Sequence, residues 1–176
     1  MRFIHKFTVT TKQQLLLLTH VFFTNACLIL GSLYILKISL LSLGFMIVFA
    51  LFFFIDTLPT IILHIQYWIK NGDAILVVDT ESKQLTYEQF NKRLSYCFGD
   101  IDHLEYYRSY GKGSGWNSFG QYRFYKVIFR DNAQIIVTCL MINNIENTFE
   151  MLIRMNSTKH FKVLCLVRKD SNLERL

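Results

Sequence analysis

The sequence predicts a membrane-embedded α-helical hairpin followed by an α+β domain, in which about six or seven antiparallel strands form a sandwich or barrel closed by a C-terminal amphipathic helix. Three observations lead to this fold class. Between Leu15 and Ile69 the only formal charges are Lys37 and Asp56. From Lys70 onward, charged residues return at the density of a soluble domain, and short alternating runs replace the long apolar run. Near the C-terminal end, apolar residues recur at helical spacing.

The first apolar run, Leu15–Leu36, contains no charged residue. As an α-helix it would be about 33 Å long, which is enough to cross a hydrocarbon core of about 30 Å. A cleaved signal peptide has a shorter apolar region and a small-residue cleavage site after it, and the sequence shows neither. We therefore predict a first membrane crossing over this run.

The second apolar run, from Ile38 toward Ile69, is longer than one crossing needs. Pro59 lacks a backbone N–H and suits the first turn of a helix. We therefore expect the run to change near Pro59 from a membrane crossing to an interfacial segment. We predict a crossing over Ile38–Ile55 and an interfacial continuation over Thr60–Lys70.

Two features of this second run bear on its depth in the bilayer. Tyr67 and Trp68 match the aromatic belt at a membrane surface. We interpret Asp56 as an interfacial residue that caps a turn before Pro59. A functional carboxylate in the middle of the bilayer remains the alternative.

Flanking positive charge predicts the orientation. Arg2, Lys6 and Lys12 precede the first helix, whereas the connection between the helices offers only Lys37. Positive residues favour the cytoplasmic side, and two crossings return the chain to its starting side. We expect a multi-pass protein of the inner (cytoplasmic) membrane with both termini in the cytoplasm.

The residues after Gly72 alternate in the manner of β-strands. The links between the runs are too short for crossover helices, which predicts antiparallel meanders. The predicted domains are an N-terminal cytoplasmic segment (1–14), the hairpin with its interfacial continuation (15–70) and the cytoplasmic β domain (71–176). The predicted strands are Ala74–Asp79, Gln84–Phe90, Leu94–Phe98, His103–Ser109, Phe119–Phe129 and Gln134–Leu140.

One helix is expected after the last of these strands. Asn143 and Glu146 are spaced as in a capping box. An apolar stripe follows on one helical face, formed by Ile145, Phe149, Leu152 and Ile153. His160–Val167 has the composition of an additional edge strand, and the role of residues 159–176 stays open.

The order of hairpin, meandering strands and closing helix resembles small bacterial two-helix membrane proteins with a pleckstrin-homology-like (PH-like) domain. Three stretches carry the resemblance: Leu58–Tyr67 before the first strand, Phe98–Ile101, and Trp116–Phe119 leading into Tyr122–Tyr125. It covers about Leu15 to Met155. It implies a PH-like β-sandwich or barrel in a membrane-anchored binding or scaffold module.

The sequence offers no signature of catalysis or of a cofactor. Its five histidines are scattered, and neither HExxH nor paired-cysteine spacing occurs, which argues against a zinc site. The four cysteines are expected to be buried free thiols. Lys and Arg are interleaved with acids rather than clustered, which argues against nucleic-acid binding. We therefore expect a protein that is not an enzyme.

A glycine-rich segment marks the candidate binding site. Gly111–Gly115 is followed by Trp116 and a strand, whereas a phosphate-binding loop is followed by a helix, so an ordinary hairpin loop is the simpler interpretation. The sharper hypothesis is that Lys112, Trp116 and Arg123 together hold a lipid headgroup or a partner peptide.

These observations predict a membrane-anchored PH-like module that recognises a protein partner or a lipid at the cytoplasmic face. One alternative is a small subunit of an oligomeric membrane transport or envelope complex. Two helices cannot enclose a pore, so that role would need homo-oligomers or other chains. A membrane-associated enzyme is the remaining alternative, but it would need a convergent set of acids or nucleophiles.

Overall fold

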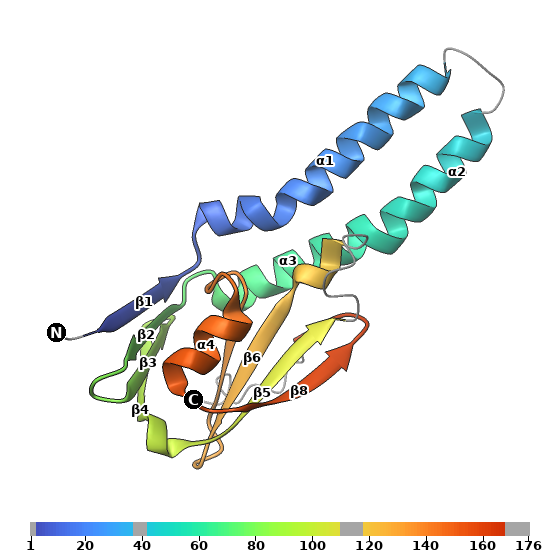
Figure 1. Ribbon diagram of the computed structural model, residues 1–176. Helices are drawn as coiled ribbons and strands as arrows, with labels where there is room; N and C mark the ends of the chain where they lie inside the picture. Colours follow the sequence, from blue (N-terminus) through green and yellow to red (C-terminus); the bar gives the residue numbers. More distant parts are fainter. Residues whose placement is uncertain (1–2, 37–41, 110–117, 168–176) are drawn as a thin grey trace.

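The computed structural model describes residues 3–36, 42–109 and 118–167 (Figure 1). Its strands form two four-stranded sheets. Sheet A has the order β1 (Ile4–Thr8), β2 (Ile75–Asp79), β3 (Gln84–Gln89) and β4 (Lys92–Cys97). Sheet B has the order β7 (Gln134–Thr138), β6 (Arg123–Phe129), β5 (Ile101–Ser109) and β8 (Ser157–Lys162). The described strands pair only within their own sheet, so the domain is a sandwich and not a closed barrel.

Strand β1 was not predicted from the sequence. It pairs antiparallel with β2, from Ile4 opposite Asp79 to Thr8 opposite Ile75. The helices between these two strands are therefore an insertion within sheet A, since one strand of the sheet precedes them and three follow. The β domain thus uses residues from the N-terminal segment as well as those after Gly72.

Strand β8 corrects the expectation of a purely antiparallel domain. It runs parallel to β5, from Leu104 opposite Ser157 to Ser109 opposite Lys162. Parallel neighbours need a crossover connection. Helix α4 (Ile145–Ile153) immediately precedes β8 and lies within that connection. The strand also ends earlier than the predicted His160–Val167.

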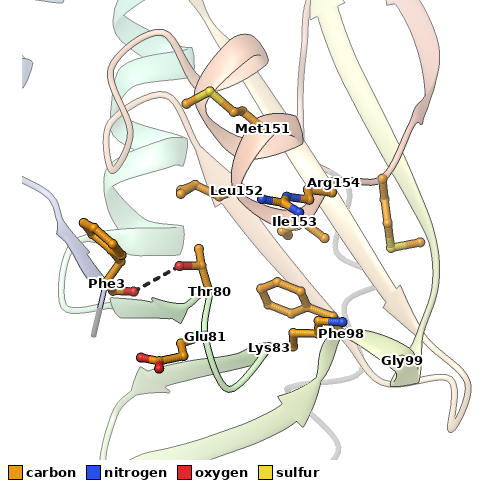
Figure 2. A pocket seen from close by; sticks show the side chains of 11 residues that line it. Phe3, Thr80, Glu81, Lys83, Phe98, Gly99, Met151, Leu152, Ile153 and Arg154 are labelled. Atoms are coloured by element: carbon orange, nitrogen blue, oxygen red, sulfur yellow. Dashed lines mark hydrogen bonds between the residues drawn. The ribbon is translucent and has the colours of Figure 1, made fainter. Parts of the chain in front are cut away.

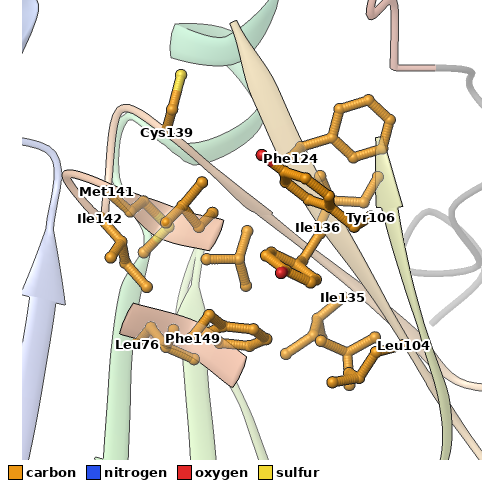
Figure 3. Packing of buried hydrophobic residues seen from close by; sticks show 14 of the residues in the cluster. Leu76, Leu104, Tyr106, Phe124, Ile135, Ile136, Cys139, Met141, Ile142 and Phe149 are labelled. Atoms are coloured by element: carbon orange, nitrogen blue, oxygen red, sulfur yellow. The ribbon is translucent and has the colours of Figure 1, made fainter. Parts of the chain in front are cut away.

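The core lies between the two sheets and beneath α4. Tyr96 of sheet A stacks on Phe129 of sheet B, with ring centroids 3.9 Å apart. Phe149 of α4 is fully buried against Tyr125, with centroids 5.0 Å apart. Figure 3 shows Leu76 of sheet A and Leu104 and Ile135 of sheet B gathered around this helix. Burial of this apolar surface is the main favourable contribution to the stability of the domain.

Two long helical arms project from the sandwich (Figure 1). The first arm is α1 (Thr11–Leu36). The second arm consists of α2 (Ser42–Phe52), a π-helical turn η1 (Phe53–Thr57) and α3 (Leu58–Asn71). The arms run side by side in opposite directions, and α3 lies along one end of the sandwich.

Pro59 does not interrupt the second arm. Thr57, which precedes α3, keeps helical angles of φ −71° and ψ −51°, and Pro59 lies in the first turn of α3. The π turn before it lets the helix continue although proline offers no N–H donor. The sequence suggested that the second apolar run changes at Asp56–Pro59. In the structure this change is a switch from π-helix to α-helix within one continuous arm.

Two local predictions in the β domain were wrong. Ser118–Gln121 forms a short 3-10 helix, η3, so the strand predicted from Phe119 begins at Arg123. The predicted capping box at Asn143 does not form, because the residue before α4 is Asn144 in the left-handed conformation, with φ 51° and no side-chain cap. The Glu146 carboxylate is engaged elsewhere, as described below.

By length and composition alone, the described part of the chain contains one helix able to cross a membrane, Met46–Asn71. The number rises to two if Thr11–Thr19 and Val21–Tyr34, which are bent by 40° relative to each other, are taken as one span.

Candidate functional site

The second arm is joined to both sheets through the side chain of Asn71, which is fully buried. Its Nδ2 donates hydrogen bonds to the Tyr87 hydroxyl (3.0 Å) and to the Ile136 carbonyl (2.9 Å). Its Oδ1 accepts one from the Thr138 amide (3.1 Å). A buried amide with these partners fixes the end of α3 to β3 and β7, because an unpaired polar group would be costly there.

Helix α3 also holds the chain that follows β8. Gln66 donates to the Val167 carbonyl (2.8 Å) and accepts from the Val167 amide (3.0 Å), in the manner of a paired strand residue. The Tyr67 side chain is fully buried and its hydroxyl donates to the Cys165 carbonyl (2.8 Å), which corrects its assignment to an aromatic belt at the membrane surface. The arm, the sandwich and the segment after β8 are therefore packed as one unit.

Asp56 does not cap its own turn, as the sequence had suggested. Its side chain is buried, and its two carboxylate oxygens accept hydrogen bonds from the amide (2.7 Å) and the hydroxyl (2.8 Å) of Ser118. The carboxylate thus lies at the first residue of η3, where amide donors stabilise negative charge. This contact gives Asp56 a structural role between the second arm and the β domain.

Arg123 is the one predicted binding residue within the described part of the chain; Lys112 and Trp116 lie outside the described residues. Arg123 begins β6 directly opposite Arg108 of β5. Both guanidinium groups approach Glu146 of α4, each with a nitrogen-to-oxygen distance of 3.8 Å. Lys159 of β8 approaches the same carboxylate at 3.4 Å. We call Arg108, Arg123, Lys159 and Glu146 the Glu146 cluster.

The Glu146 cluster is mostly buried, with the Glu146 side chain 9% exposed and those of Arg108 and Arg123 24% and 22% exposed. The Tyr106 hydroxyl donates to a Glu146 oxygen at 3.4 Å. Burial raises the pKa of Tyr106 to about 12, so it remains a donor at neutral pH. The Arg108 guanidinium also lies 4.3 Å from the centre of the Phe161 ring, a cation–π contact.

Sequence reasoning missed most of this cluster. Arg108, Lys159 and Glu146 lie in three elements that only the sheet pairing and the packing of α4 bring together. The one available signal was periodicity, since Arg108 shares a strand face with the buried Tyr106. A cation on the core-facing side of a strand implies a buried partner.

A groove of about 780 Å³ opens at the end of α4 (Figure 2). Phe98 and Met151 contribute apolar lining, and Phe3 lies at its β1 side. Lys83 and Arg154 bring positive charge to the same groove. Concave apolar surfaces with a few polar groups are common binding sites for peptides and small molecules.

Neither metal-ligand clusters nor disulfides occur in the described part of the chain. No group of three or more His, Cys, Asp or Glu residues is arranged to hold a metal ion. All four cysteines are free, with Cys139 and Cys165 buried. Cys27 and Cys97 are exposed, which corrects the expectation that every cysteine is buried.

Two stacked four-stranded sheets, one antiparallel and one mixed, with a helix packed on their core define an α+β domain. A family model described as PH domain matches residues 5–149, and the chain belongs to this family. The match begins in β1 and ends in α4, so it spans the inserted helices. No curated protein and no solved structure matched the chain.

Proposed function

We propose that this protein is a membrane-anchored PH module that binds a protein or a lipid at the cytoplasmic face of the membrane. The observation that best supports this proposal is the insertion of two apolar helical arms between the paired strands β1 and β2. PH domains are generally binding modules without catalytic activity, which agrees with the absence of catalytic motifs from the sequence.

The position of the insertion constrains its topology. Because β1 and β2 are hydrogen-bonded neighbours, the chain must leave and re-enter the β domain on the same side of any bilayer. Two crossings satisfy this condition, whereas a single crossing would separate the two strands. The sheet pairing therefore supports a hairpin that enters the membrane and returns.

The arms expose an apolar surface that water does not favour. Soluble monomers rarely expose contiguous apolar patches above a few hundred Å². Trp68, 44% exposed, lies near the sandwich end of the second arm, where an interfacial aromatic residue is expected. Exposed large apolar side chains on the two arms include Leu15, Leu16, Phe22, Phe23, Ile29, Leu30, Leu33, Met46, Ile47, Val48, Leu51, Phe54 and Ile55.

The native cysteines allow a direct test of anchoring and sidedness. Cys27 is exposed on α1, and Cys97 is exposed on β4 of the sandwich. Burial raises the pKa of Cys139 to about 11 and that of Cys165 to about 12, so these two thiols should react slowly. The experiment treats membrane vesicles of known sidedness with a maleimide that cannot cross the bilayer, and Cys27→Ser and Cys97→Ser variants assign each signal.

We expect Cys97 to react in inside-out vesicles and not in right-side-out vesicles, because the sandwich faces the cytoplasm. Cys27 should react in neither preparation until detergent is added, because lipid covers it. Labelling of Cys27 without detergent, or release of the chain by carbonate, would refute the anchoring. Labelling of Cys97 in right-side-out vesicles would reverse the orientation.

The binding role is tested on the same preparation. Mass spectrometry of the gently extracted chain should detect a co-purifying protein or a retained lipid. Recovery of the chain alone, at both low and physiological salt, would argue against a binding module.

A further inference from the structure

The groove at the end of α4 lies at the opposite end of sheet A from the helical arms. Strand β1 runs from Ile4 toward the first arm and ends at Thr8, which pairs with Ile75, the first residue of β2 after the second arm. The groove residue Phe3 precedes Ile4, and its carbonyl accepts hydrogen bonds from the amide and the hydroxyl of Thr80, both at 3.3 Å (Figure 2). With the arms in a membrane, the groove faces away from the bilayer and is open to a soluble partner.

The two cations that line the groove have no ionic partner. Lys83 belongs to the turn between β2 and β3, and Arg154 directly follows α4. Both residues are exposed, and neither side chain makes a hydrogen bond or an ion pair within the described part of the chain. Glu81 is the acid of the lining, so the groove carries an excess of one positive charge. Complementary charge therefore favours a ligand with carboxylates.

The backbone conformation of these two cations is costly. Lys83 has a φ of 52° and Arg154 a φ of 57°, both in the left-handed region. A side chain with a Cβ atom is disfavoured there, and glycine or asparagine is the usual residue after a helix. Of the four other described residues with positive φ outside glycine, three are asparagines and one is Phe90. The two charged residues in this conformation thus both line the groove, and such retained strain is typical of functional positions.

The apolar part of the groove consists of aromatic and flexible side chains. Met151 is 71% exposed and Phe3 is 60% exposed. Phe98 and Met155, which are partly buried, also line the groove. Methionine adapts its shape to different ligands and is common at peptide-binding surfaces. Contact of the arms with lipid does not account for these exposed apolar side chains, because they lie at the other end of the sandwich.

We propose that this groove binds a peptide segment of a soluble partner protein, in which carboxylates flank apolar side chains. The carboxylates pair with Lys83 and Arg154, and the apolar side chains pack against Phe98 and Met151. Glu81 selects against segments with many acids, because it repels a further carboxylate beside it. The choice of a protein over a lipid rests on the proposed membrane anchoring, since it depends on the direction that the groove faces. The acidic and apolar character of the ligand does not.

The test begins with selection from a phage-displayed library of random dodecapeptides on the full-length chain, purified in a non-ionic detergent. We expect the enriched peptides to carry Asp or Glu beside Leu, Phe or Met. The most enriched peptide is then synthesised with a fluorescent label and titrated by fluorescence anisotropy. Replacement of its acidic residues by the matching amides should weaken its binding at least tenfold.

Substitutions in the chain assign the binding to the groove. Lys83→Gln and Arg154→Gln should each weaken peptide binding at least fivefold, and Met151→Ser should do the same through loss of apolar contact. Lys92→Gln is the matched control, because Lys92 is an exposed cation of the same sheet at the end near the arms, opposite Gln89. This control should bind the peptide as tightly as the unchanged chain.

Arg154→Gly separates a binding role from a structural one. Glycine is favoured in the left-handed conformation after a helix, so this variant should melt about 2–4 °C higher than the unchanged chain. It should nevertheless bind the peptide as weakly as Arg154→Gln does. A lower melting temperature of Arg154→Gly would show that the arginine is retained for stability, and it would overturn the argument from strain.

Three further results would overturn the proposal. The selection could enrich no peptide, or only peptides without acidic residues. Lys83→Gln and Arg154→Gln could bind the selected peptide as tightly as Lys92→Gln. Dihexanoyl phosphatidylserine could displace the peptide, which would assign the groove to a lipid. Because all these measurements use detergent solution, their failure would not bear on the vesicle labelling, and failure of the labelling would leave the acidic peptide site standing.

Discussion

The two halves of the second helical arm, α2 and α3, differ in how their side chains are buried. In α3, buried residues recur along one stripe, at Thr60, Leu63, Tyr67 and Asn71, and the last two donate hydrogen bonds into the β domain. In α2, large apolar side chains such as Met46, Val48 and Leu51 are exposed. One face of α3 is therefore packed in the protein interior, while its other face exposes Ile62, Ile65 and Ile69. In α2 the exposed apolar side chains are of the kind that lipid would accommodate.

Under the proposed anchoring, this difference would let one continuous helix join a membrane segment to a folded domain. Buried polar groups fix α3 in one position, because each needs a particular partner. Exposed apolar side chains need no particular partner; they are stabilised by any apolar surroundings that remove them from water. Stability of the β domain should therefore depend on α3, whereas membrane partition should depend on α2.

The largest expected effect is alkaline unfolding of the β domain. Burial raises the pKa of Tyr87 and of Tyr106 to about 12, and it also raises the pKa values of Tyr122 and Tyr125. An unfolded tyrosine titrates near pH 10, so this contribution to stability is complete below pH 10 and is lost as pH rises from 10 toward 12.

Each such tyrosine costs about 1.4 kcal/mol per pH unit in that window. Circular dichroism of the detergent-solubilised chain between pH 9 and 12 should show loss of the β signal, with much of the helical signal of the arms retained. Simultaneous loss of both signals would show that the arms and the sandwich unfold together, which would weaken the distinction between them.

A smaller effect is expected from Asn71→Leu. Leucine has a similar volume, but it leaves the Thr138 amide and the Ile136 carbonyl without their partner in the core. We expect the free energy of unfolding of the sandwich to fall by about 4 kcal/mol. Denaturant titration followed by tyrosine fluorescence measures it.

The matched control for that substitution is Asn147→Leu, on the exposed side of α4. It should change stability by less than about 0.5 kcal/mol. Similar losses of unfolding free energy in the two variants would show that the hydrogen bonds of the buried Asn71 amide do not hold α3 to the sheets.

The smallest of the three effects is expected from Val48→Arg, at a position that is 58% exposed on α2. An arginine near the centre of a crossing costs about 2.5 kcal/mol in membrane insertion. The fraction of chain that resists carbonate extraction should fall, while the melting of the sandwich in detergent stays unchanged. Met151→Arg, on the 71% exposed surface of α4, is the control and should remain in the membrane fraction. Equal extraction of both variants would mean that α2 does not lie in lipid.

Local pattern predicted many elements of the fold. Strands β2, β3, β4 and β7 lie where alternation placed them, within a few residues at each end. Helix α4 follows its apolar stripe, because spacing at 3.6 residues leaves one face to be buried. The membership in the PH family agrees with the resemblance drawn from element order. The membrane crossing of the arms and the cytoplasmic location remain predictions.

The candidate site was less accessible to sequence reasoning. Arg123 was singled out because it follows a glycine-rich loop, but the charged residues beside it come from β5 and α4. Glu146 was interpreted as part of a capping box, whereas its carboxylate lies between three cations. Local spacing alone could not distinguish a helix cap from a buried ion cluster, since both place an acid in the first turn.

The sequence by itself determined the helical character of the arms, the alternation of the central strands and the apolar face of α4, because each is encoded by residues a few positions apart. Only the tertiary structure decided that β1 joins β2 across the inserted arms, that β8 runs parallel to β5, and that Asp56 binds Ser118. Those features depend on contacts between distant segments, and local periodicity specifies which face is buried without specifying its partner.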